Sequence, residues 1–167
     1  MKKVREDNIP EMYRFQKNLS TCRKLLGWSC DDFGAYVGLS RQTVYNIEVN
    51  KSDISKTQYI AMRAIIDSEI LSNPEETKVV ALYLKMFVDN PEDYSDEERK
   101  VLKEKINLNM PSIAAGTATR KNVSDEIIET AAIIIPAIGA AVAALLLTND
   151  SLINGVTSWI SSSKKKR

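Results

Sequence analysis

The apolar residues of the first 112 positions recur at the three- and four-residue spacing of amphipathic helices, and this spacing constrains the fold most. No stretch shows sustained strand alternation or a two-residue hairpin signal. Serines precede several of the periodic segments, where a hydroxyl can accept hydrogen bonds from the free N–H groups of a first helical turn. The sequence therefore predicts an all-α protein.

Helix boundaries are predicted from local signals. Gly27 and Gly38 suit the left-handed position that follows a helix, and Ser29, Ser40 and Ser95 suit the position that precedes one. Six helices are expected, over 12–26, 30–38, 41–49, 56–71, 74–88 and 95–108. Pro, Gly and short polar residues then predict a linker, with a boundary near residue 112. The expected parts are a first domain at 1–72, accessory helices that can pair two subunits at 73–110, a linker at 111–126 and a C-terminal part at 127–167.

The composition excludes several classes of chemistry. The chain contains no histidine, which rules out hydrolysis with a His base and His-ligated zinc. Its two cysteines, Cys22 and Cys30, are too few for a disulfide scaffold and are interpreted as small buried residues. No phosphate-binding loop or metal-ligand spacing appears, so we expect no enzyme activity, no cofactor and no metal. The net charge of +1 excludes binding of polyanions by bulk charge alone.

Residues 37–40 join two short predicted helices and indicate a helix-turn-helix, because glycine permits the tight turn and leucine can fill the corner. In the second of these helices, Val44 and Ile47 are expected to face inward. The outward side chains match base edges in a major groove, since arginine pairs with guanine and glutamine or asparagine with adenine. We expect Arg41, Gln42 and Asn46 to contact bases, Ser40 and Thr43 to contact phosphate or a thymine methyl, and Lys51 to contact phosphate.

Residues 15–71 of the 167 resemble the Xre-type helix-turn-helix family of phage repressors and bacterial regulators. The resemblance is carried by LSRQTVYNIEVNKS, by RKLLGWS before it, and by Phe33-Gly34 and Val37-Gly38. It implies binding of double-stranded DNA by a dimer that places two recognition helices in successive major grooves. It also implies an ion pair between Arg23 and Glu48, which contributes about 0 to 1 kcal/mol if it is exposed.

Two positions depart from the family pattern. Cys30 stands where the family usually has a glutamine that contacts a phosphate and braces the recognition helix, so we expect that contact to be weakened or lost. Gly34 stands where alanine is usual, at a cost of up to about 1 kcal/mol in helix propensity. Lys51 and Lys56 flank the loop after the recognition helix, where each phosphate contact would steepen the salt dependence of binding.

The C-terminal part contains an uncharged run at 130–149. As one helix, its 20 residues would reach about 30 Å, the thickness of the hydrocarbon core of a bilayer. Pro136 is expected to kink this helix, and Gly139 and Ala143 form a small-residue pair that lets helices approach closely. The predicted membrane or oligomer segment comprises Ile133, Pro136, Gly139, Ala143 and Trp159.

Residues 152–160 are expected to form a second, short amphipathic helix, whose tryptophan and following basic residues 164–167 suit a membrane interface. A single span would place these charges outside, whereas a re-entrant hairpin keeps both ends inside. The alternative is a water-soluble bundle in which both helices are buried between subunits. The full fold prediction is thus an N-terminal bundle of five to six helices containing a helix-turn-helix, then a hydrophobic helix and a short amphipathic helix.

Taken together, these patterns predict a sequence-specific DNA-binding transcriptional regulator, a repressor, whose C-terminal segment anchors or assembles it. The expected partners are double-stranded DNA, further copies of the chain as a homodimer or higher oligomer, and membrane lipid. The expected location is the cytoplasm or the inner face of the cell membrane. Two alternatives remain: a membrane-associated structural adaptor that uses the helix-turn-helix to bind a protein, and an immunity or antitoxin component.

Overall fold

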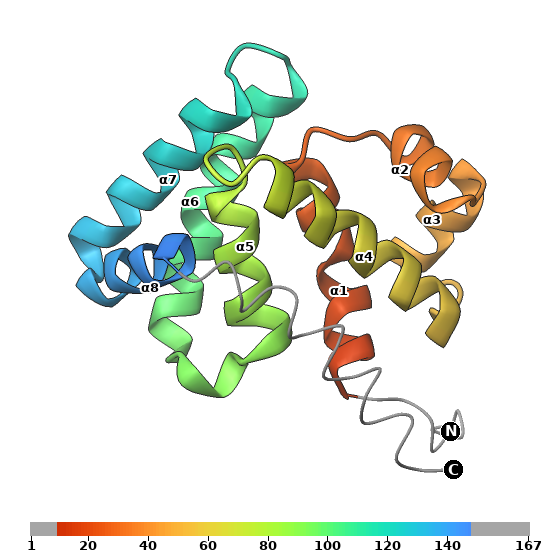
Figure 1. Cartoon of the computed structure of the whole chain (residues 1–167), viewed down its shortest axis with the longest axis horizontal. Coiled ribbons are helices and arrows are strands. Elements are labelled where there is room, and N and C mark those ends of the chain that lie inside the picture. The colour runs from red at the N-terminus through yellow and green to blue at the C-terminus, as the bar shows by residue number, and fades with distance from the viewer. Residues whose placement is uncertain (1–9, 148–167) are drawn as a thin grey trace.

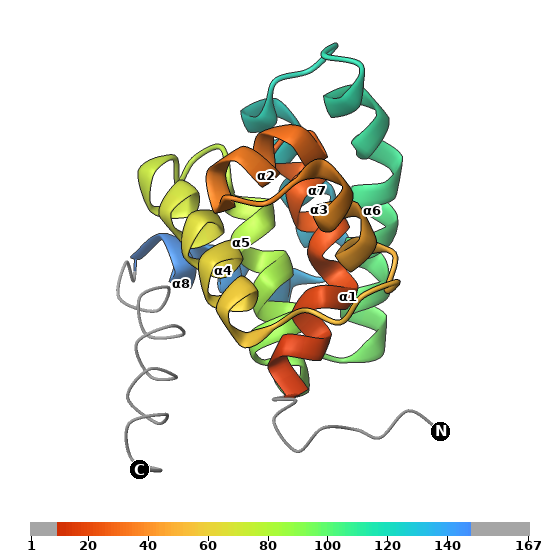
Figure 2. The same cartoon turned by 90° about the vertical axis from the view of Figure 1, so that its right-hand side faces the viewer.

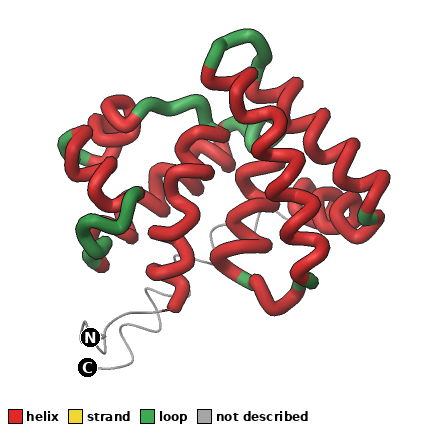
Figure 3. Tube along the Cα trace, turned by 180° about the vertical axis from the view of Figure 1, so that it is seen from behind, coloured by secondary structure: helices red, strands yellow, loops and turns green. Residues whose placement is uncertain are grey.

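The structure, a computed structural model, describes residues 10–147, and every regular element in this range is helical (Figure 1). This confirms the all-α prediction for this part of the chain, in which Figure 3 shows helices joined by loops. The elements are α1 Pro10–Leu25, α2 Cys30–Val37, α3 Arg41–Glu48, α4 Lys56–Ser72, α5 Lys78–Leu84, a π-helical turn η1 Lys85–Asp89, a 3-10 turn η2 Pro91–Asp93, α6 Asp96–Ala114, α7 Arg120–Ile134 and α8 Pro136–Leu147.

The predicted helix starts after Ser29, Ser40 and Ser95 are confirmed by their caps. Ser29 accepts a hydrogen bond from the backbone N–H of Asp32, whose carboxylate in turn accepts from the Ser29 N–H, so two free donors are satisfied. Ser95 and Glu98 form the same reciprocal arrangement before α6. Each cap depends on residues within four positions of one another, which is why the sequence predicts them well.

Helix α1 lies between two groups of helices. Helices α2 and α3 pack on one side of it with α4, and α5 to α8 lie on the other side (Figures 1 and 2). Buried side chains from both groups form one cluster, which includes Phe15 of α1, Ile66 of α4 and Ile127 of α7. The part of the chain that carries the helix-turn-helix therefore shares its core with the C-terminal helices.

A buried arginine joins α4 to the turn after α5. Arg63 is 1% exposed, and its Nε lies 2.9 and 3.0 Å from the two carboxylate oxygens of Asp67. Its Nη1 and Nη2 donate to the carboxylate of Asp89 at 2.5 and 2.8 Å. Burial raises the pKa of Asp67 to about 6, although the arginine opposes that shift. One guanidinium thus binds both the buried carboxylate of Asp67 and the half-buried carboxylate of Asp89.

The predicted helix over 74–88 begins later than expected. The carbonyl oxygen of Asn73 accepts from the Glu76 N–H at 3.1 Å and from the Thr77 hydroxyl at 2.8 Å. These bonds hold 74–77 in a turn, so α5 starts at Lys78.

The predicted linker over 111–126 is corrected to a loop of residues 115–119. Helix α6 continues through Pro111, which leaves the carbonyl of the exposed Asn107 without its helical donor but open to water. Thr119 then caps α7 by accepting from the backbone N–H of Asn122 at 3.2 Å. Arg120 of α7 donates to Glu69 at 2.7 Å and to Glu76 at 2.6 Å. Residues assigned to a linker thus belong to two packed helices.

The predicted continuous hydrophobic helix over 130–149 is wrong within the described residues. Helix α7 ends at Ile134, and Ile135 takes an extended conformation with φ −131° and ψ 95° before Pro136 starts α8. The proline ring disfavours helical geometry in the residue before it, so the chain breaks here rather than kinking. Within 10–147, no helix has both the length and the apolar character needed to cross a membrane.

Helix α8 instead packs on α5 and α7, with Ile138 and Val142 buried. Gly139 lies against α7, since a Cβ added there would be 3.4 Å from the Cβ of Ala132. Ala143 and Ile133 stay exposed. The predicted short helix with Trp159 and the basic residues 164–167 lies outside the described residues.

Replacing Arg63 with methionine should destabilise the protein by about 3 to 5 kcal/mol at neutral pH, because the buried carboxylate of Asp67 and the half-buried carboxylate of Asp89 lose their partner. The loss of stability should be larger near pH 8 than near pH 5. Burial raises the pKa of Asp67, and removal of the cation raises that pKa further. The folded variant is therefore stabilised by protonation of Asp67 near pH 5 and lacks this stabilisation near pH 8. Urea unfolding at both pH values measures this. Lys100→Met, at an exposed position of α6, is the control and should change stability by less than about 0.5 kcal/mol. Equal effects of the two substitutions would contradict the role of Arg63.

Candidate nucleic-acid interface

The turn between α2 and α3 is built on two glycines. Gly38 has φ +72°, a left-handed conformation that side chains disfavour. The Leu39 N–H donates to the carbonyl of Gly34 at 2.8 Å, and a Cβ added to Gly34 would lie 2.5 Å from the carbonyl oxygen of Leu39. The turn is therefore too tight for alanine at position 34, the residue usual there in the family that the sequence resembles.

The inner face of α3 is apolar and fully covered. Val44 and Ile47 are 0% and 1% exposed, as their spacing predicts, and α3 packs on α1. This burial decides which face of α3 is turned away from solvent.

Arg23 of α1 and Glu48 at the end of α3 form a two-pronged ion pair. The Nε and Nη2 atoms donate to the two carboxylate oxygens at 2.6 and 2.9 Å, and Nη1 donates to the Trp28 carbonyl at 2.6 Å. The side chains are 9% and 5% exposed, so this is not the exposed pair for which about 0 to 1 kcal/mol is expected. The hydrogen bonds that Arg23 donates to Glu48 raise the pKa of Arg23.

Cys30 lies beside this pair. Its thiol donates to Glu48, with Sγ 3.9 Å from Oε2. Burial, with the Glu48 charge as a second cause, raises the pKa of the thiol, so the thiol form is favoured. The cysteine therefore takes part in holding α3 from the position at which the family usually has glutamine.

Gln16 of α1 is a site residue that sequence reasoning missed. Its amide Nε2 donates to the carbonyls of Ile47 at 2.9 Å and Ser52 at 2.8 Å, and its Oε1 accepts from the Ile54 N–H at 3.0 Å. The side chain is 5% exposed. A polar residue one turn after Met12, on the inward face of its helix, needs buried partners, and this was the available signal.

The outer face of α3 brings together the residues predicted to contact bases. Arg41 and Gln42 are exposed and Asn46 is half-buried. The Gln42 Nε2 donates to the Asn46 Oδ1 at 2.8 Å, so the two amides lie side by side. The Nη1 of Arg41 is 3.7 Å from Asp31 Oδ2, with side chains 74% and 66% exposed, so water screens this contact.

The residues predicted to contact the phosphate backbone of DNA lie at the two ends of α3. Ser40 caps the helix by accepting from the Thr43 N–H at 3.1 Å, and the two hydroxyls are 2.9 Å apart. Lys51 follows the helix, with its Nζ 5.7 Å from the centre of the Tyr45 ring.

Figure 2 shows α2 and α3 on the side of the molecule that faces the viewer, in front of α1. The candidate interface is therefore an outward helix fixed from behind by Gln16, Arg23 and two apolar side chains. Comparisons with protein-family models, curated proteins and solved structures find no match to this chain.

The Arg23–Glu48 pair should show a coupling energy above about 1 kcal/mol in a double-mutant cycle with Arg23→Met and Glu48→Gln. Each single substitution should cost about 3 kcal/mol, because the remaining charge or amide stays buried without its partner. Chemical denaturation of the four proteins measures the cycle. The exposed Arg41–Asp31 pair supplies a matched control, with a coupling of about 0 to 1 kcal/mol. Similar coupling in both pairs would show that burial of Glu48 does not strengthen the bond.

Proposed function

We propose that this protein is a sequence-specific DNA-binding regulator of transcription and that α3 is its recognition helix. One observation carries the proposal: Arg41, Gln42 and Asn46 stand together on the outer side of a short helix whose inner side is locked to α1. A recognition helix that contacts base edges needs this combination of polar groups on its outer side and a rigid attachment on its inner side.

The side-chain chemistry suits base recognition. The guanidinium of Arg41 offers two parallel donors to the O6 and N7 atoms of guanine, and its contact with Asp31 is weak enough to be exchanged. The Gln42 and Asn46 amides each offer a donor and an acceptor, which is the pattern of the adenine edge. Their mutual hydrogen bond holds both amides on the same side of α3 before DNA binds.

Contacts to the phosphate backbone would come from the two ends of α3. Its N-terminal turn carries Ser40 and Thr43 and presents backbone N–H groups, which favour anions. Lys51 adds a cation after the C-terminal end. Because the chain carries a net charge of only +1, these local groups have to supply the electrostatic attraction.

A dimer is part of this proposal. One recognition helix contacts only a few base pairs, and paired helices about 34 Å apart would read two half-sites one helical turn apart. A bound site should therefore be an inverted repeat. Binding that covers a promoter and excludes the polymerase would make the protein a repressor.

A second function, binding of a protein through the same surface, is favoured by the aromatic and apolar side chains around α3. Tyr36, Tyr45 and Val49 are 53%, 46% and 41% exposed. Tyrosines are enriched at protein interfaces, whereas DNA interfaces depend more on basic groups. The two functions separate in a selection from random DNA duplexes, because a protein adaptor enriches no sequence.

Selection of random duplexes with the full-length protein should yield an inverted repeat. On that sequence, Arg41→Ala and Gln42→Ala should each weaken binding by about 1 to 3 kcal/mol and relax the preference at one base pair, because each removes a contact to a base edge. Fluorescence anisotropy at fixed salt measures the affinities. Lys103→Ala and Asn107→Ala, at exposed positions of α6, remove the same kinds of group elsewhere and should leave affinity unchanged. The proposal fails if no sequence is enriched, or if the α3 variants bind like these controls.

Lys51→Ala should weaken binding to all duplexes by a similar factor and leave the base preference intact, because a phosphate contact carries no sequence information. The slope of log affinity against log salt concentration should become shallower by about one unit. Anisotropy titrations at several salt concentrations measure this slope. An unchanged slope with altered base preference would place Lys51 in the groove instead.

A further inference from the structure

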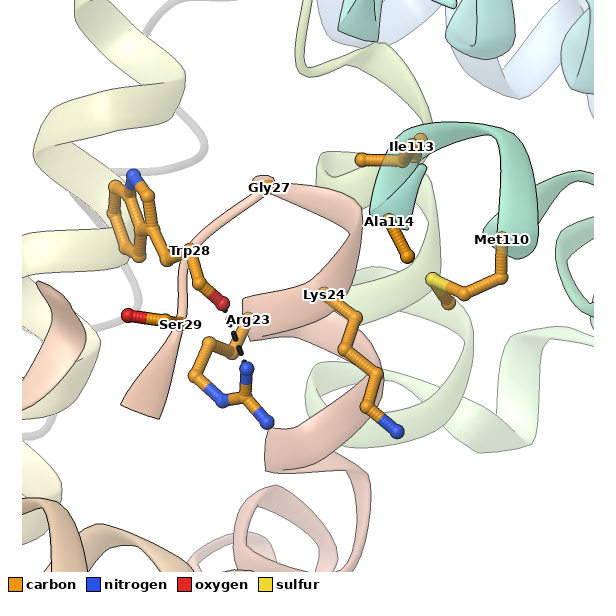
Figure 4. Close-up of a pocket in the computed structure, with 8 residues that line it drawn as sticks. All are labelled: Arg23, Lys24, Gly27, Trp28, Ser29, Met110, Ile113 and Ala114. Carbon is orange, nitrogen blue, oxygen red and sulfur yellow. Dashed lines mark hydrogen bonds between the residues drawn. The ribbon is translucent and has the colours of Figure 1, made fainter. Parts of the chain in front are cut away.

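A pocket of about 350 Å³ lies where the connection between α1 and α2 meets the C-terminal end of α6 (Figure 4). This volume is at the small end of the range for ligand sites. Arg23, Lys24 and Trp28 line it from the first side, and Met110, Ile113 and Ala114 line it from α6. The pocket is separate from the outer face of α3.

The apolar part of the lining has a fixed shape. The Trp28 ring stacks on Phe33 with centroids 5.7 Å apart and meets the edge of Tyr36 at 5.1 Å, so its orientation is set by two neighbouring aromatic rings. Figure 4 shows this ring on the side of the connection that is turned away from α6, while Met110 and Ile113 are half-buried on α6 and form the apolar wall of the pocket. Figure 4 shows the α6 side chains across the pocket from the connection that carries Trp28. These groups suit the apolar body of a small molecule.

The polar part contains one positive charge that the fold does not use. Arg23 is already bound to Glu48 and to the Trp28 carbonyl, so its charge is neutralised. Arg120 donates to the Leu26 carbonyl at the end of α1. Lys24 is exposed and makes no ion pair or side-chain hydrogen bond within residues 10–147. Its ammonium group is therefore available to a ligand at the rim of the pocket.

We propose that this pocket binds a small organic carboxylate with an aryl or branched-alkyl body. The body packs against Met110, Ile113 and Ala114, beside the connection that carries Trp28, and the carboxylate pairs with Lys24. A carboxylate on an apolar body matches a site with an apolar lining and a single cation, whereas a neutral or cationic molecule of the same shape gains nothing from the lysine. The site goes beyond DNA binding and does not depend on it.

The pocket also borders the network that holds the recognition helix. Arg23 and the Trp28 carbonyl belong to the lining, and the other side of the Arg23 guanidinium binds Glu48 of α3. An occupant therefore touches a group that is itself bonded to α3.

The test uses the full-length protein with Trp159→Phe, which leaves Trp28 as the only tryptophan of the chain. Phenylacetate and its neutral amide, phenylacetamide, are titrated while Trp28 fluorescence and the NMR signal of the Met110 methyl group are recorded, alongside a panel of branched-alkyl and aryl carboxylates of similar size. We expect a saturable change with carboxylates, with dissociation constants on the order of 1 mM, and affinities at least about fivefold weaker for the amides.

Lys24→Met should reduce carboxylate affinity to that of the amides. Lys17→Met, seven positions earlier on the same face of α1 and outside the pocket lining, is the matched control and should retain full affinity. Ala114→Phe should fill the pocket and abolish the change while the urea midpoint stays within the range of the control.

Three results would overturn the ligand site: no saturable change with any carboxylate up to about 20 mM, equal affinity for acids and amides, or equal affinity of the Lys24→Met and Lys17→Met proteins. None of these measurements contains DNA, so failure here leaves the proposed function untouched.

Discussion

Two polar side chains of α1, Gln16 and Arg23, fix α3 on the molecule, and the geometry of the candidate interface depends on them. Apolar burial is not directional, so Val44 and Ile47 decide which face of α3 is covered but not its exact rotation and position along the axis. Hydrogen bonds have preferred distances and angles and therefore remove that freedom. Gln16 holds the loop that follows α3, and Arg23 holds its last residue, Glu48. The helix is thus fixed at its C-terminal end, while its cap at Ser40 is supplied locally.

Helix α1, which carries Gln16 and Arg23, also contacts the rest of the protein. Its far side packs on α5 and α6, and the buried cluster continues to Ile138 of α8. Arg63 extends the polar ordering on the other side of the core, where it fixes α4 to the turn after α5. The pocket beside the C-terminal end of α6 and helix α3 share a bonded neighbour, because Arg23 lines the pocket and binds Glu48 of α3 directly.

Local signals were enough to predict most helix starts, since a cap such as Ser29 with Asp32 involves neighbouring residues only. The partners of Gln16 could not be predicted, because an amide can bond any backbone group and its acceptors lie 31 and 36 positions away. The prediction of one continuous helix over 130–149 was wrong for a different reason. Hydropathy is summed over residues whether or not the backbone is continuous as a helix. It therefore indicated the length of the apolar run over 130–149 but not the effect of Pro136 on the conformation of the residue before it.

The outward side chains of α3 differ from Gln16 and Arg23 because they contribute little to the stability of the fold. Arg41 makes one screened contact, and the hydrogen bond between Gln42 and Asn46 is exposed, where water competes for both amides and the net gain is small. Folding alone would be served as well by other helix-forming polar residues at these positions. Three side chains with base-matching donors and acceptors are thus gathered on one rigid surface and contribute little to stability, which is the arrangement that the proposed recognition of bases requires.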